Sequence, residues 1–175
     1  IYLANPDNPM GSHHPASVIE DMIANLPDHS LLVLDEAYAD LAPPAHGLAS
    51  ADVPFVKADV MQIDALREAF KGADAVIHLA GLDYDWGCPG EDYINVNTRG
   101  SWHALQAAED AGVKRVVLCS SIAICGLQEM RPDWKPQSLP IDESHENRPC
   151  YPFGFSKEIA ETMGRSFARR GEIEV

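Results

Sequence analysis

Residues 114–126, KRVVLCSSIAICG, decide the fold. Within this stretch Val116–Leu118 is an apolar, mostly β-branched run without alternation, which is typical of a strand buried on both faces inside a parallel sheet. Two hydroxyl side chains, Ser120 and Ser121, come almost directly after the strand. Because ligands of open α/β sheets bind at the carboxyl ends of the strands, we expect a polar site here.

Strand-like and helix-like patterns alternate along the rest of the chain. Short apolar runs predict strands, and apolar residues at helical spacing predict helices, in the order strand 1–4, helix 15–26, strand 31–34, strand 55–57, helix 63–70, strand 75–79, helix 91–110 and helix 153–169. In the helix at 91–110, Ile94, Trp102 and Leu105 are expected to face the core. This order predicts a doubly wound, mostly parallel Rossmann-like α/β sheet with helices on both faces. The chain ends at 172–175, where a further strand would begin, so we expect the sheet to be incomplete.

Composition limits the classes of protein to which the chain can belong. Its 175 residues suit one ordinary domain, and a formal net charge of −14 argues against a nucleic-acid-binding surface, which needs a basic patch. No stretch approaches the roughly 18 apolar residues of a membrane span, and no signal peptide opens the chain. Its 4 cysteines form no Cys-x-x-Cys pair, which argues against a metal site and is typical of reduced thiols in the cytoplasm. We therefore expect a small-molecule substrate and no nucleic-acid or membrane partner, with a homodimer left open.

A set of short motifs follows in a fixed order through the second part of the chain: Asp59-Val60, His78–Gly81, Asn97–Ser101, Ser120-Ser121 and Gly154–Lys157. With this set, residues from about 54 to 175 resemble the extended short-chain dehydrogenase/reductase family, the NAD-dependent epimerase/dehydratases. The resemblance implies an oxidoreductase that uses NAD or NADP. Its substrate would be a nucleotide sugar or a similar molecule with a hydroxyl or carbonyl group, changed by hydride transfer.

The same resemblance implies the catalytic residues. Ser121 would orient the substrate oxygen, and Lys157 would hold the nicotinamide ribose and lower the pKa of a tyrosine four residues earlier, the family's general acid and base. Phe153 occupies that tyrosine position and has no ionisable group. Tyr151 is the candidate replacement if it lies before the helix, and the alternative is that Tyr151 is only a loop aromatic.

Cofactor contacts are implied in the same way. Asp59 and Val60 would contact the adenine. Leu79, Ala80 and Gly81 would lie against the nicotinamide-side ribose. Asn97 would hydrogen-bond the backbone near the active site. The alternative, without the resemblance, is that Asp59 is a turn residue, that residues 79–81 form a tight exit from the strand, and that Asn97 makes its hydrogen bonds within its own helix. The glycine-rich turn that binds a pyrophosphate is missing, since the first loop offers only Gly11.

Residues 1–44 resemble a second family, the fold-type I pyridoxal-phosphate aminotransferases close to histidinol-phosphate aminotransferase. The resemblance depends on the sequences at 5–11 and 34–38. It implies that Asn8 and Tyr38 hydrogen-bond the phenolic oxygen of pyridoxal phosphate and that Asp35 pairs with the pyridine nitrogen. No lysine stands where that family forms its Schiff base, so transamination would lack its covalent anchor.

The two resemblances predict the domain organisation. An aminotransferase-like βαβ segment at 1–44 is joined through 45–53 to a partial NAD(P)-binding Rossmann domain at 54–175. Either the chain is a chimera, or the first segment fills the opening place of one continuous sheet. Three functions follow: an epimerase/dehydratase-like oxidoreductase impaired by Phe153 and the missing glycine-rich turn, an aminotransferase fragment, or a catalytically silent remnant.

Overall fold

The computed structural model describes most of the second part of the chain and short pieces of the first: residues 2–4, 14–25, 33–35, 56, 58–84, 87–127 and 133–175. The chain divides into two compact units, Ile1–Val56 and Lys57–Val175. The predicted junction at 45–53 lies outside the described residues, and so does most of the predicted strand at 55–57.

The first unit contains the predicted βαβ pattern. Strands β1 (Tyr2–Ala4) and β2 (Val33–Asp35) pair in parallel, and helix α1 (Ala16–Ala24) lies between them in the sequence. The helix begins directly after Pro15, a residue that cannot donate to a preceding turn. Of the apolar residues at helical spacing, Ile19 is 1% exposed but Ile23 is 37% exposed, so the described apolar face is only partly buried.

The second unit contains a parallel pair of strands, β3 (Ala75–His78) and β4 (Arg115–Leu118). A single parallel bridge joins Arg115 of β4 to Glu174, since the Val116 amide donates to the Glu174 carbonyl over 2.8 Å and the Glu174 amide donates to the Lys114 carbonyl over 2.9 Å. The strand expected to begin at 172–175 is therefore represented by this one bridge.

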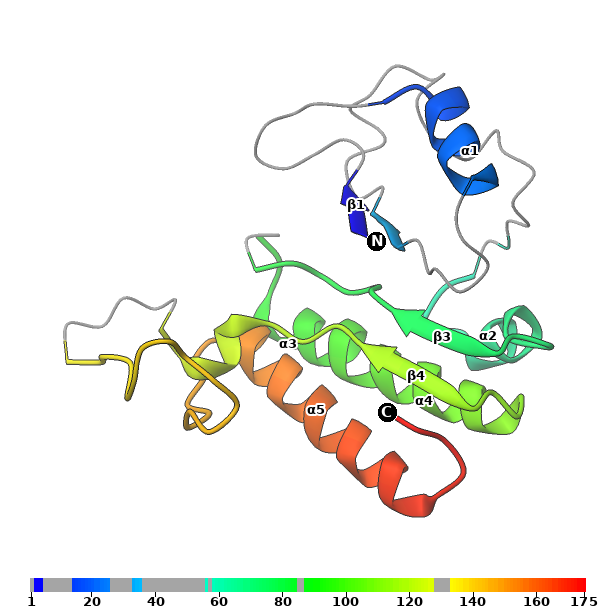
Figure 1. The fold of residues 1–175 in the computed structure, drawn as a ribbon. Helices are drawn as coiled ribbons and strands as arrows, with labels where there is room; N and C mark the ends of the chain where they lie inside the picture. The colour runs from blue at the N-terminus through cyan, green and yellow to red at the C-terminus, as the bar shows by residue number, and fades with distance from the viewer. Residues whose placement is uncertain are drawn as a thin grey trace. The chain divides into compact units, whose positions relative to one another are not determined.

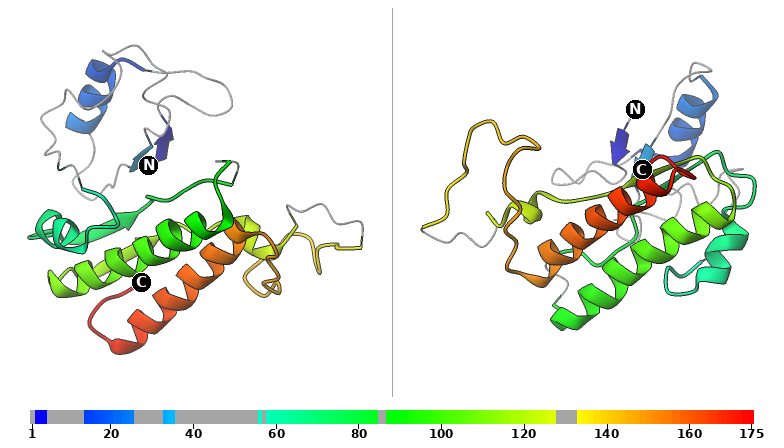
Figure 2. Two further views of the ribbon diagram at one scale, coloured as in Figure 1. Left: turned by 180° about the vertical axis from the view of Figure 1, so that it is seen from behind. Right: turned by 90° about the horizontal axis from the view of Figure 1, so that it is seen from below.

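The predicted helices of the second unit are present: α2 (Ile63–Ala69), α3 (Gly90–Tyr93) continuing through the π-helical η4 (Ile94–Arg99) into α4 (Gly100–Asp110), and α5 (Pro152–Arg170). A short 3₁₀ turn, η5 (Ile122–Cys125), follows β4. Figures 1 and 2 show α4 and α5 side by side along one face of the β3–β4 pair.

This arrangement corrects the prediction that Val116–Leu118 is buried on both faces. Val116 is 2% exposed, but Val117, on the other side of the strand, is 49% exposed. The reason is that alternate residues of a strand face opposite sides, and the described helices that pack on β4 lie on one side of it. Cys119, which follows the last residue of β4, is also exposed.

The core of the second unit lies between the strands and these helices. Its buried members are apolar side chains of the strands, of α4 and α5 and of the segments beside them, namely Val76, Leu105, Ala108, Val113, Val116, Phe167 and Ile173. Trp102, predicted to face the core, is instead 40% exposed and packs its ring edge-on against Phe167 at 5.1 Å. Arg170 lies 5.5 Å from the Trp102 ring and covers it from outside.

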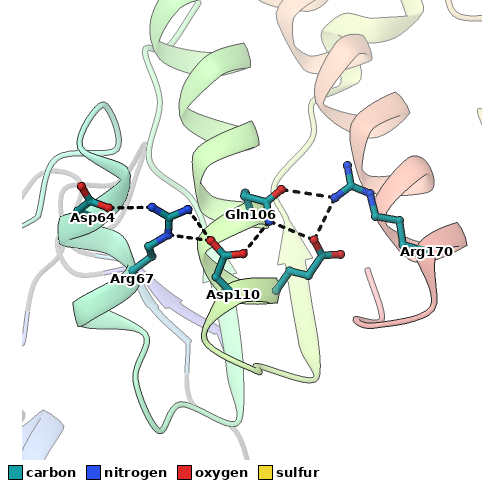
Figure 3. Close-up of polar contacts among 6 residues, drawn as sticks. Asp64, Arg67, Gln106, Asp110 and Arg170 are labelled. Carbon is teal, nitrogen blue, oxygen red and sulfur yellow. Dashed lines mark hydrogen bonds and ion pairs between the residues drawn. The ribbon is translucent and has the colours of Figure 1, made fainter.

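Charged side chains connect the ends of the three main helices (Figure 3). Arg67 of α2 pairs with Asp110 of α4 at 2.6 Å, and Arg170 of α5 pairs with Glu109 of α4 at 3.0 Å. Gln106 donates to both carboxylates and so joins the two pairs. The four paired side chains are 15–40% exposed, so each ion pair is expected to contribute only modestly to stability.

Candidate functional site

The candidate site lies at the carboxyl ends of β3 and β4. The Lys157 ammonium of α5 donates to the Cys119 carbonyl over 3.0 Å, and the Cys119 amide donates to the His78 carbonyl over 3.2 Å. Burial lowers the pKa of Lys157, while the neighbouring Cys119 and Asp83 act in the opposite direction. The predicted lysine therefore sits where the parallel strands end.

Both serines after β4 have local partners. The Ser121 hydroxyl accepts from the Ala123 amide over 3.2 Å and caps η5, and the Ser120 hydroxyl donates to the Glu161 carboxylate over 2.6 Å. Both serines line a hollow of about 280 Å³, together with Glu161 and residues 141–143. Glu161 lies one helical turn after Lys157, so α5 contacts the end of β4 through both side chains.

Asn97 connects three segments around the site. Its side chain accepts from the Leu82 amide over 2.7 Å and donates to the Leu82 carbonyl over 3.0 Å and to the Ser156 hydroxyl over 3.2 Å. Ser156 in turn donates to the Phe153 carbonyl over 2.6 Å. The reading of Asn97 as satisfied within its own helix is therefore wrong.

The loop after β3 approaches Asn97 closely. A Cβ atom at Gly81 would lie 2.9 Å from Asn97 Oδ1, so only glycine leaves room for this contact. Asn97 itself lies in the π-helical η4, an element that is frequent at functional sites. The structure thus brings Gly81 and Asn97 together.

Phe153 takes the place next to the lysine that the family gives to tyrosine. It is 5% exposed, and the Lys157 ammonium lies 5.7 Å from the centre of its ring. Tyr151 precedes α5 in an extended conformation, and its ring lies 5.2 Å from Tyr84 and 6.4 Å from Tyr93. Among the described residues, the lining of the hollow beside Tyr151 includes Pro149 and Phe155 but neither Ser121 nor Lys157.

His78 is a site residue to which sequence reasoning gave no role. Its Nε2 lies 3.1 Å from the Ser101 hydroxyl, which donates to the Asn97 carbonyl over 2.6 Å. Since the single hydroxyl proton goes to that carbonyl, His78 Nε2 carries a proton and donates. Burial, and then the positive charge of Lys157, lower the pKa of His78 to about 4. The signal in the sequence was a histidine inside an otherwise apolar strand.

The other carried-over residues have simpler surroundings. The Asp59 carboxylate accepts from the Met61 amide over 2.8 Å, as a turn aspartate does, and the Val60 carbonyl accepts from His103 over 2.8 Å. Leu79 and Ala80 are exposed at the strand exit. Asn8 and Tyr38 lie outside the described residues, and of the aminotransferase-like set only the backbone of Asp35, the last residue of β2, is described.

The described part of the chain contains no group of three or more histidine, cysteine, aspartate or glutamate side chains placed to hold a metal ion. Among its helices, none has the length and apolar character needed to cross a membrane.

Solved structures establish the fold. The chain aligns over 98% of its length with 52% of DesIV, a dTDP-glucose 4,6-dehydratase from Streptomyces venezuelae solved with NAD bound, with a TM-score of 0.64 and 21% identity. The fold is therefore the Rossmann-like α/β fold of the short-chain dehydrogenases/reductases, as predicted.

Residues 16–175 match the profile of the NAD dependent epimerase/dehydratase family, and the chain belongs to that family. It is 34% identical over 116 residues, 66% of this chain and 32% of the relative, to the N-acetyl-alpha-D-glucosaminyl-diphospho-ditrans,octacis-undecaprenol 4-epimerase of Escherichia coli O157:H7. It is 32% identical over 125 residues, 67% of this chain and 48% of the relative, to the L-arabinose 1-dehydrogenase (NAD(P)(+)) of Haloferax volcanii. The chain thus spans between a third and a half of these relatives.

A short match also exists to the second family. The chain is 52% identical over 40 residues to the histidinol-phosphate aminotransferase of Rhodospirillum centenum, which is 23% of this chain and 11% of the aminotransferase. A match this short supports a resemblance of one segment. It does not support a pyridoxal-phosphate enzyme.

Proposed function

We propose that the chain forms the dinucleotide-binding part of an NAD- or NADP-dependent oxidoreductase that transfers hydride to and from a sugar hydroxyl or carbonyl group. The observation that carries the proposal is the position of Lys157, whose ammonium reaches the Cys119 carbonyl at the carboxyl end of β4. Family membership and the NAD- or NADP-dependent relatives support the same cofactor.

The residues present fit the nicotinamide end of such a cofactor. An ammonium has three donors, and in the described part of the chain the Lys157 ammonium makes one hydrogen bond, to Cys119, which leaves donors for the hydroxyl groups of a ribose. When bound, NAD supplies a hydride acceptor to the site. The residues expected at its pyrophosphate, 5–11, lie outside the described part of the chain.

The chain's own side chains would bind the cofactor and orient the substrate. Lys157 would bind the ribose, and Ser121, which lines the hollow beside β4, would orient the substrate oxygen. Asn97 would hold the loop at Leu82 against the first turn of α5. Phe153 supplies no proton, so the proton donor must come from another residue.

Several finer expectations belong to this proposal. The substrate is a sugar, free or attached to a nucleotide, and no nucleic-acid partner is expected for a chain with a net charge of −14. A cytoplasmic location, a homodimer and the boundaries 1–44, 45–53 and 54–175 stay predictions. Within the proposal, the first segment fills the place of the family's opening βαβ unit.

Calorimetric titration of the chain with NAD and with NADP tests the proposal. We expect saturable binding of one of them, weakened at least about tenfold by Lys157→Met because that change removes the donors to the ribose. Lys71→Met is the matched control, since Lys71 is exposed and pairs only with Glu68 among the described residues. No binding of either dinucleotide at millimolar concentration would refute the proposal, and binding without hydride transfer to any sugar would indicate a silent remnant.

A further inference from the structure

Three tyrosines surround the position at which Phe153 replaces the family's proton donor. The rings of Tyr84 and Tyr93 each lie 6.1 Å from that of Phe153, and the ring of Tyr151 lies 5.2 Å from that of Tyr84. Each carries a phenol, the group that Phe153 lacks. The surroundings of the three hydroxyls distinguish them.

Tyr93 does not suit the role of proton donor, because its side chain is buried and its hydroxyl is bonded to a backbone carbonyl. It is 1% exposed, and its hydroxyl donates to the Tyr84 carbonyl over 3.0 Å. A proton held in a buried bond to a backbone carbonyl is not free to exchange with a substrate. Tyr93 therefore supports the loop that carries Tyr84.

Tyr151 faces a different part of the surface. Its ring packs on Tyr84 and Tyr93, and it lines a hollow of about 290 Å³ formed by the start of α3 and the start of α5. Among the described residues that line this hollow, neither Ser121 nor Lys157 occurs. Tyr151 would have to leave these ring contacts to reach the site.

Tyr84 combines a place against the Phe153 ring with a hydroxyl that has no hydrogen-bond partner among the described residues. It lies in the segment after β3, and its ring packs on Phe153, over which the Lys157 ammonium lies at 5.7 Å. Its neighbour Asp83 is close enough to Lys157 to stabilise the ammonium. In the described part of the chain no group hydrogen-bonds the Tyr84 hydroxyl, although the backbone is held through Leu82 and Tyr93.

We propose that Tyr84 is the general acid and base of this chain, in place of the phenol that Phe153 lacks. The inference rests on the proposed hydride-transfer function. In the oxidation, Tyr84 would take the proton of the substrate hydroxyl. The dinucleotide, whose ribose Lys157 would hold, would supply the acceptor for the hydride that leaves the same carbon, so that the alcohol would become a carbonyl as the dinucleotide is reduced.

Fluorine NMR tests the position of Tyr84 without turnover. The full chain is labelled with 3-fluorotyrosine, which gives signals from its 5 tyrosines, and the signals are assigned with Tyr→Phe variants. On titration with NAD we expect the Tyr84 signal to shift, with the dissociation constant found by calorimetry, and by more than the Tyr151 signal. A Tyr84 signal that does not move while NAD binds would overturn the inference and leave the proposed function intact. Absence of NAD binding would instead overturn the proposed function.

Hydride transfer, followed at 340 nm with a panel of aldoses and nucleotide sugars, tests the role. Tyr84→Phe should lower the rate about 100-fold or more, as the loss of a general acid does, with NAD affinity unchanged. Tyr151→Phe should not, and adding Phe153→Tyr to the Tyr84→Phe variant should restore activity. A Tyr84→Phe variant as active as the wild type would contradict the assignment. So would a wild-type chain that binds NAD but becomes active only after Phe153→Tyr.

Discussion

Asn97 and Leu82 exchange two hydrogen bonds, since the Asn97 side chain accepts from the Leu82 amide over 2.7 Å and donates to its carbonyl over 3.0 Å. The side chain thus satisfies a loop residue on both sides, as a neighbouring strand would. Its remaining amide proton reaches Ser156 in α5. One buried side chain therefore fixes the loop that carries Tyr84 and the helix turn that carries Phe153 and Lys157.

Replacing this side chain should destabilise the second unit. Asn97→Ala leaves the partly buried Leu82 amide and carbonyl without their side-chain partner, which costs about 1–3 kcal/mol. Urea unfolding followed by circular dichroism should show a lower midpoint with an unchanged slope. Gln106→Ala is the control, because Gln106 bonds only to side chains of the helix-end network among the described residues. A loss no larger than that of the control would show that Asn97 does not hold the loop.

Gly81→Ala tests the same contact from the other side. The added Cβ would lie 2.9 Å from Asn97 Oδ1, so the asparagine must move, at a cost of about 1–3 kcal/mol. In the double variant with Asn97→Ala the added Cβ no longer meets the asparagine side chain. The loss in the free energy of unfolding should therefore be smaller than the sum of the losses in the two single variants. Strict additivity in urea unfolding would contradict the contact.

Gly126 ends η5 and should tolerate no side chain. Its φ is +70°, and a Cβ there would run into the Arg148 carbonyl and lie 2.7 Å from the Trp134 ring. Gly112 has a φ of +76° with nothing within 4 Å of its Cβ position, which makes Gly112→Ala a matched control for backbone strain alone. In thermal unfolding, Gly112→Ala should lower the free energy of unfolding by about 1 kcal/mol. Gly126→Ala should lower it by at least about 2 kcal/mol more than this control. Equal losses would mean that the loop at Arg148 moves aside without cost.

His78 should make stability depend on pH. Its folded-state pKa is lowered from 6.5 to about 4, so the unfolded chain binds the proton more readily. The stability that this histidine contributes is therefore complete above pH 6.5 and is lost as the pH falls toward 4. Between pH 7 and pH 5 the loss should be about 2 kcal/mol in the free energy of unfolding.

Urea unfolding at several pH values measures this dependence, with His78→Gln as the test variant. The variant should flatten the curve between pH 7 and pH 5, while His103→Gln, at a site with no comparable burial, should not. An unchanged curve in His78→Gln would assign the pH dependence to other groups.

Much of this protein could be predicted from its sequence, because the deciding signals are local. Apolar runs and helical spacing gave the parallel strands β3 and β4 and the helices α2, α4 and α5. The order of short motifs pointed to the family, and the position of Phe153 four residues before Lys157 showed that its proton donor was missing.

Only the tertiary structure decided how those residues meet. Asn97 bonds to Leu82, which is 15 positions away in the chain, and to Ser156, which is 59 positions away. No periodicity in the sequence encodes these two partners. The exposure of Val117 depends on which face of β4 the helices cover, and the same apolar run is compatible with either outcome. Along the sequence, Tyr151 is the tyrosine nearest to Phe153, whereas in the structure the Tyr84 ring packs against Phe153. The reason is that contacts in space depend on how separate elements pack and not on their separation along the chain.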